Sequence, residues 1–114
     1  MTTEQLRKID RLIDQHVMRH LHYGTLARIG FRPTEDIAAA WEVVEELTAP
    51  GEPRTEQFLC TVCCSAVAVG RTFATFERSA YAGELDEFSA DADTAPLAIS
   101  LAALKAVGVD IDKI

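Results

Sequence analysis

Long apolar runs are missing from this chain of 114 residues. A helix that crosses a bilayer needs about 18 or more consecutive apolar residues, and no segment reaches that length. The N-terminal stretch MTTEQLRKID also lacks the apolar core of a secretory signal peptide. We therefore expect a cytoplasmic protein with no membrane partner.

Cysteine is scarce, and the three cysteines stand close together at positions 60, 63 and 64. This spacing cannot build the disulfide framework that stabilises small secreted domains. The cysteines lie within FLCTVCCSAVAVG, a run of β-branched and small residues that is typical of a buried strand. We expect reduced thiols that pack in the core.

Sequence motifs of catalysis are absent as well. The chain contains no GxSxG nucleophile motif, no glycine-rich phosphate-binding loop and no HExxH zinc-binding pair. Catalysis needs polar groups that converge in a cleft, whereas the polar residues of this chain are dispersed. The sequence therefore indicates a binding protein that has no catalytic residues and no cofactor.

Net positive charge is also lacking, since 11 basic and 18 acidic residues give a formal net charge of -7. Residues 1–32 hold six basic and three acidic residues, and the remainder holds five and fifteen. A mainly acidic surface repels phosphate. An α-β-β-β-α order is found in double-stranded RNA-binding domains, but here Asp91, Asp93 and Thr94 precede the last helix in place of lysines. We expect no direct binding to nucleic acid.

Helical patterns are present in three segments. Thr2 and Gln5 match a capping box that starts a helix over Thr3–His20. Thr34 is the expected N-cap of a second helix. Its predicted buried face consists of Ile37, Ala40, Trp41, Val44 and Leu47. A third helix is predicted over Ala95–Val107, with Gly108 directly after it.

Strand patterns occupy the region between the second and third helices. The sequence predicts one strand from Gln57 to Ala66 and another from Arg71 to Glu77, joined as a hairpin near Gly70. SAYAGELDEF is a candidate third strand at the sheet edge, followed by the acidic loop SADAD. We predict one α+β domain over residues 1–114, with helices on both faces of a small antiparallel sheet in α/β/α layers.

Three stretches of the chain resemble one known family. They are DRLIDQHVM, PTEDIAAAWEVVEEL and DTAPLAISLAALKAVGV. Together they are similar to the phage ABA sandwich domain, a family of small phage and prophage proteins. The resemblance implies helical layers on both faces of a sheet, and it supplies no catalytic residues to carry over.

A metal or thiol site is the alternative that the residues leave open. His16 and His20 lie one helical turn apart, and Cys60 and Cys63 follow at a spacing that zinc sites use. An enzyme built on these four residues is the competing function. A strand, however, sends positions three apart to opposite faces. We predict a protein without bound metal.

An acidic run is the candidate partner-binding site. It consists of Glu84, Asp86, Glu87, Asp91 and Asp93. Such a surface suits a basic host or phage protein, including a nucleic-acid-binding protein whose substrate it imitates. Taken with the phage resemblance, this predicts an accessory protein of the host cytoplasm that binds a protein and counters host defence. Self-association through the third helix or a free sheet edge is a further option.

Overall fold

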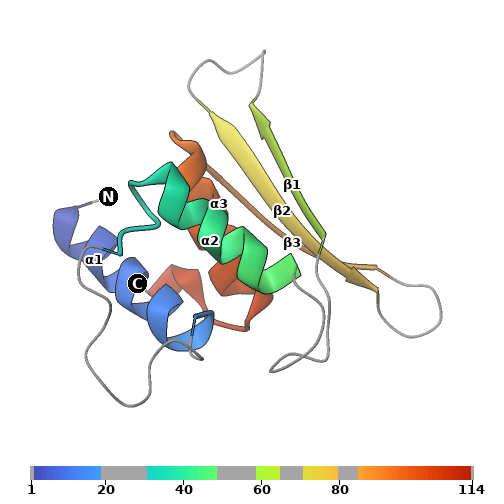
Figure 1. The fold of residues 1–114 in the computed structure, drawn as a ribbon, viewed down its shortest axis with the longest axis horizontal. Coiled ribbons are helices and arrows are strands. Elements are labelled where there is room, and N and C mark those ends of the chain that lie inside the picture. Colours follow the sequence, from blue (N-terminus) through green and yellow to red (C-terminus); the bar gives the residue numbers. More distant parts are fainter. Residues whose placement is uncertain (1, 19–30, 49–58, 65–70, 80–84, 114) are drawn as a thin grey trace.

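The structure is a computed structural model that describes residues 2–18, 31–48, 59–64, 71–79 and 85–113 (Figure 1). Its elements are α1 (Thr3–His16), α2 (Ile37–Thr48), β1 (Leu59–Cys64), β2 (Thr72–Ser79), β3 (Leu85–Ala92), α3 (Ala95–Ala106) and the short 3-10 helix η3 (Ile111–Lys113). This order and the antiparallel pairing of the strands confirm the α+β class.

The first helix begins at the predicted capping box. The Gln5 backbone N–H donates to the Thr2 hydroxyl at 3.1 Å, and the Thr2 N–H donates to the Gln5 side chain at 2.9 Å. Ile9 and Ile13 are fully buried on one face. The helix ends at His16, earlier than predicted, and His20 lies outside the described residues.

The second helix begins later than predicted, and its buried face includes the predicted Ala40, Val44 and Leu47 but not Ile37 and Trp41. A turn over residues 32–36 precedes it, and the Asp36 carboxylate accepts from the Ala38 N–H at 3.0 Å, so Thr34 is not the cap. The prediction that Ile37 and Trp41 are buried is wrong. The buried face consists of Ala39, Ala40, Val43, Val44 and Leu47. Small side chains let α2 approach its neighbour closely, and this favours the alanine and valine face over the bulkier one.

The three strands form a sheet in the order β1-β2-β3. One face of this sheet is buried, since Ala74, Phe76, Ala90 and Ala92 are at most 8% exposed. The opposite face, which we call the open sheet face, includes Thr61, Phe73, Thr75, Glu87, Ser89 and Asp91. The predicted hairpin partners β1 and β2 are thus confirmed, while Gly70 lies outside the described residues.

The third strand lies later in the chain than predicted. Leu85–Ala92 takes in most of the segment SADAD, which was expected to be an acidic loop. The reason is visible in the alternation of that segment, because Phe88, Ala90 and Ala92 face the helices and polar residues stand between them. Most of the acidic residues therefore belong to a strand.

The third helix is as apolar and as buried as its sequence predicts. The Leu97 N–H donates to the Thr94 hydroxyl at its start, and Gly108 has a φ of 86° after its end. Buried residues run from Ala98 to Leu104 without interruption. No helix of the described residues is long and apolar enough to span a bilayer.

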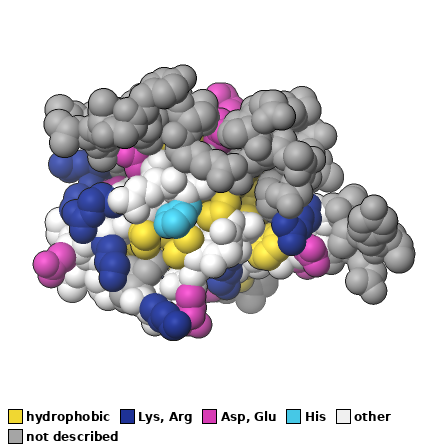
Figure 2. Space-filling model, turned by 90° about the horizontal axis from the view of Figure 1, so that it is seen from below, with side chains coloured by type: hydrophobic (Ala, Val, Ile, Leu, Met, Phe, Trp, Pro, Cys, Tyr) yellow, Lys and Arg dark blue, Asp and Glu magenta, His cyan; other side chains and the backbone are white. Residues whose placement is uncertain are grey.

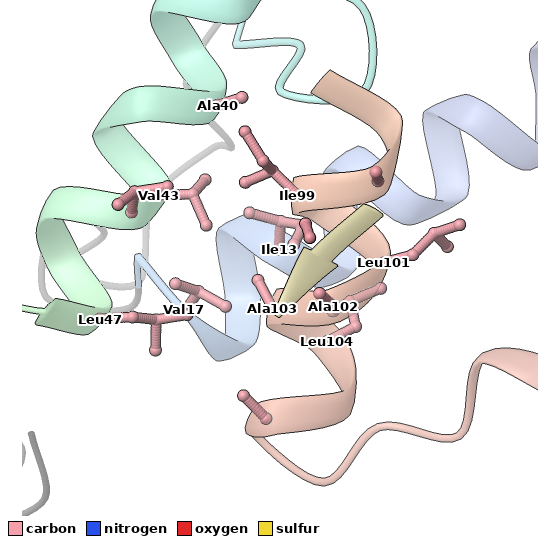
Figure 3. Close-up of a cluster of buried hydrophobic side chains, with 14 of the residues drawn as sticks. Ile13, Val17, Ala40, Val43, Leu47, Ile99, Leu101, Ala102, Ala103 and Leu104 are labelled. Carbon is pink, nitrogen blue, oxygen red and sulfur yellow. The ribbon is translucent and has the colours of Figure 1, made fainter. Parts of the chain in front are cut away.

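Among the described elements, the layers differ from the expected α/β/α arrangement. α3 packs against β2 and β3 on one side and against α2 and α1 on the other, so it is the middle layer (Figure 1). Figure 3 shows Val43 of α2 and Ile13 of α1 near Ile99 of α3, with Leu47 of α2 beside Val17. A helix that is apolar all round must be covered on both sides. Consequently no described helix is left to cover the open sheet face.

Candidate partner-binding surfaces

The predicted acidic site lies mainly on β3. Arginines directly before β2 and within it pair with its carboxylates. Arg78 Nε donates to Asp86 at 3.0 Å. Arg71 binds both Asp91 and Asp93, the latter at 2.7 Å. The hydrogen bond from Arg71 and its positive charge hold the pKa of the Asp91 carboxyl below its usual range. These three carboxylates therefore form cross-strand ion pairs and do not create a continuous acidic surface.

The remaining residues of the predicted site do not gather with them. Glu87 is exposed on the open sheet face, and its register partner on β2 is another carboxylate, Glu77. Glu84 lies outside the described residues. Lys105 of α3 donates to the Ser89 carbonyl of β3 at 2.7 Å, which adds a third cation beside this strand. Of the four predicted carboxylates that are described, Asp91 and Asp93 are thus the two that lie together, around Arg71.

The proposed metal and thiol residues are separated in the parts that are described. His16 lies exposed at the end of α1, and Figure 2 shows a histidine side chain at the surface beside apolar side chains. Cys60 is register partner of buried Phe76, whereas Cys63 is partner of exposed Phe73, so these positions alternate between the faces of β1. His20 is not described. No group of three potential ligands occurs among the described residues.

The environment of Cys60 opposes thiol chemistry. The residue is half-buried against the core. Burial raises the pKa of the Cys60 thiol to about 11. A nucleophilic cysteine requires the thiolate, which this environment disfavours at neutral pH. The buried thiol matches the expected core role.

A buried polar cluster joins α1 to the segment before α2. Asp10 is only 5% exposed, and its carboxylate accepts from the Thr34 N–H at 3.0 Å. Arg7 binds Asp10 at 2.8 Å and Glu35 at 2.7 Å. Burial raises the pKa of the Asp10 carboxyl, although the hydrogen bond from the Thr34 N–H and the charge of Arg7 act in the opposite direction. Arg7 Nε and Thr34 Oγ1 are buried without a hydrogen-bond partner among the described residues, but the charges of Arg7, Asp10 and Glu35 pair with one another, so we assign the cluster a structural role that positions the start of α2.

Three large apolar side chains are exposed among the described residues. Ile37 and Trp41 are 44% and 46% exposed on α2, and Phe73 is 45% exposed on the open sheet face. Together with Glu45, Ile37 and Trp41 lie at intervals of four residues along one line of α2, which we call the α2 outer ridge. The described part of the chain therefore presents two aromatic surfaces, one on α2 and one on the sheet.

Comparison with known families decides the origin of the chain. The model of the phage ABA sandwich domain matches residues 10–104. The chain belongs to the phage ABA sandwich domain family. This confirms the resemblance seen in the sequence and indicates a small phage protein. Searches of curated proteins and of solved structures gave no match.

The matched region of this phage ABA sandwich protein runs from the buried Asp10 of α1 to the buried Leu104 of α3. It includes both aromatic surfaces. A sequence signal for one of them exists, because Phe73 and Phe76 are three residues apart in a strand and must therefore occupy opposite faces. For α2, the sequence shows two apolar ridges and gives no signal of which one is exposed.

Proposed function

We propose that this phage ABA sandwich protein is an accessory protein that acts by binding another protein in the host cytoplasm. The observation that carries the proposal is the exposure of Ile37, Trp41 and Phe73, each near 45%. Aromatic side chains are enriched where proteins bind one another. Family membership provides the phage setting.

A finer part of the proposal concerns the partner. The net charge of -7 favours a basic partner, because opposite charges speed association and select partners. Host proteins that act on nucleic acids have positively charged surfaces, and blocking one of these proteins would counter host defence. Direct nucleic-acid binding does not form part of this function.

Copurification during infection tests the proposal. A tagged copy is produced from the phage, and proteins that remain bound are quantified by mass spectrometry. A folded variant that combines Trp41→Ala with Phe73→Ala serves as the control. We expect the natural chain to retain one protein in an amount close to its own, and we expect the variant to lose that protein. Equal retention of every protein by both chains would contradict a binding function at these surfaces.

A further inference from the structure

The α2 outer ridge combines apolar and acidic side chains. Ile37 and Trp41 are 44% and 46% exposed, and Glu45 is exposed one turn further along the helix. The indole of Trp41 thus lies between an aliphatic side chain and a carboxylate. Such a line of side chains is suited to contact with an elongated segment of another protein.

The charge of α2 has one sign. The helix contains Glu42, Glu45 and Glu46 and no lysine or arginine, and Asp36 stands directly before it. Glu42 and Glu46 make other contacts, but no ion pair of the described residues involves Glu45. Glu45 also lies in the last turn, where the helix dipole disfavours a negative charge. Its carboxylate is therefore placed where it does not help the fold.

The open sheet face provides the contrast within the same molecule. Phe73 is as exposed as Trp41, but its register partner Asp91 is bound by Arg71. The charges next to Phe73 are therefore already paired, whereas the carboxylates Glu77 and Glu87 lie farther along the same face. Charge complementarity with a basic partner is therefore available beside Trp41 and is much reduced beside Phe73.

We infer that the α2 outer ridge is the docking site for a basic amphipathic segment of the partner protein. Apolar side chains of that segment cover Ile37 and Trp41. A lysine or arginine lies over the indole and pairs with Glu45, because a cation is attracted both to the face of a tryptophan ring and to a carboxylate. The inference rests on the proposed protein-binding function and names its surface and the chemistry of its partner.

Titration with two synthetic peptides tests the inference on the full chain. One peptide contains leucine and lysine in helical periodicity, and the other has glutamate in place of lysine. Trp41 is the chain's single tryptophan, so its fluorescence reports contact at the ridge. We expect the lysine peptide to shift Trp41 emission to shorter wavelength and to move amide resonances of α2, whereas the glutamate peptide does neither.

Matched variants distinguish the effect of the ridge on peptide affinity from the effect of the overall charge of the protein. Trp41→Ala and Glu45→Lys are each expected to weaken binding of the lysine peptide by about tenfold, as for an interface hot spot. Phe73→Ala and Glu87→Lys make the same changes on the open sheet face, and we expect each to change affinity by less than about twofold. Circular dichroism of all four variants verifies that they are folded.

Four outcomes would overturn the inference. Equal effects of Glu45→Lys and Glu87→Lys would mean that overall charge drives binding. Shifts confined to β2 and β3 would place the site on the sheet and leave the binding function standing. Burial of Trp41 by self-association, seen by light scattering without peptide, would make a second copy the occupant. If neither peptide binds, the inference fails, and copurification still decides the binding function.

Discussion

The α2 outer ridge and the open sheet face expose aromatic side chains to a similar extent, but their charges are arranged differently. Trp41 and Phe73 are 46% and 45% exposed. On the sheet face, Asp91 and Asp93 are bound by Arg71, whereas Glu45 on the ridge forms no ion pair among the described residues. Exposure alone therefore does not distinguish the two aromatic side chains, whereas the pairing of the charges next to each of them does.

The largest effect is expected in α3, which lies between the sheet and the other helices. Leu101 is 6% exposed, so Leu101→Ala leaves a cavity and should lower the free energy of unfolding by about 2 to 5 kcal/mol. Exposed Trp41→Ala and Phe73→Ala should each change it by only about 0.5 kcal/mol. Chemical denaturation measures all three. A loss below about 1 kcal/mol for Leu101→Ala would mean that α3 is not the buried middle layer.

The next effect concerns Asp10, which positions the segment leading into the ridge. Asp10→Ala removes the acceptor of the buried Thr34 N–H and should cost about 1 to 3 kcal/mol. Asp10→Asn retains an acceptor oxygen and should cost less.

The pH dependence of stability gives a second measurement at Asp10. Because burial raises the pKa of this carboxyl above the usual 3.8, the folded state binds the proton more strongly than the unfolded state. The contribution of Asp10 is therefore fully present below 3.8 and is lost as pH rises through the raised pKa. Unfolding followed across this range should show a smaller decline for Asp10→Asn than for the natural chain. An identical decline would contradict the raised pKa.

Binding variants sharpen the comparison directly. Trp41→Ala should weaken the binding of a basic partner by about tenfold, or about 1.4 kcal/mol, while Phe73→Ala should have little effect on it. Calorimetric titration of both variants with the lysine peptide measures the difference. Equal losses would make the two surfaces parts of one site, and a larger loss for Phe73→Ala would reverse the assignment.

The smallest effect is a gain in stability at the ridge. Removing the charge of Glu45 by Glu45→Gln should raise the free energy of unfolding by about 0.3 to 1 kcal/mol, because the carboxylate opposes the helix dipole. Glu4 lies in the first turn of α1, where the dipole favours it, so Glu4→Gln should lower stability by a similar amount. Thermal unfolding of both variants and of the natural chain measures these changes in stability. If Glu45→Gln destabilises the protein, the carboxylate supports the fold and is not reserved for a partner.

Much of the fold could be predicted because local signals agree with the tertiary structure. The capping box of Thr2 and the glycine that follows the third helix depend on local chemistry, and both lie as predicted. The extent of β3 was missed because its acidic residues suggested a loop, although Phe88, Ala90 and Ala92 alternate with them. Period-two alternation was the stronger signal.

The surfaces could be predicted only in part, because they depend on which neighbour each element meets. Trp41 was expected in the core, since α2 has two apolar ridges and the sequence does not say which one faces α3. Asp86 and Asp91 were expected to form a free acidic surface, but the register of β2 and β3 places arginines beside them. Such pairings across strands depend on tertiary register and are not visible in local patterns.

Photo-crosslinking during infection tests the central claim most directly. A photoreactive phenylalanine analogue is placed at position 41 in one copy of the protein and at position 73 in another, and the crosslinked partner segments are identified by mass spectrometry. We predict crosslinks from position 41 to a segment of net positive charge, and few from position 73. Crosslinks from position 73 alone, or from position 41 to an acidic segment, would contradict the assignment of the α2 outer ridge as the site for a basic partner.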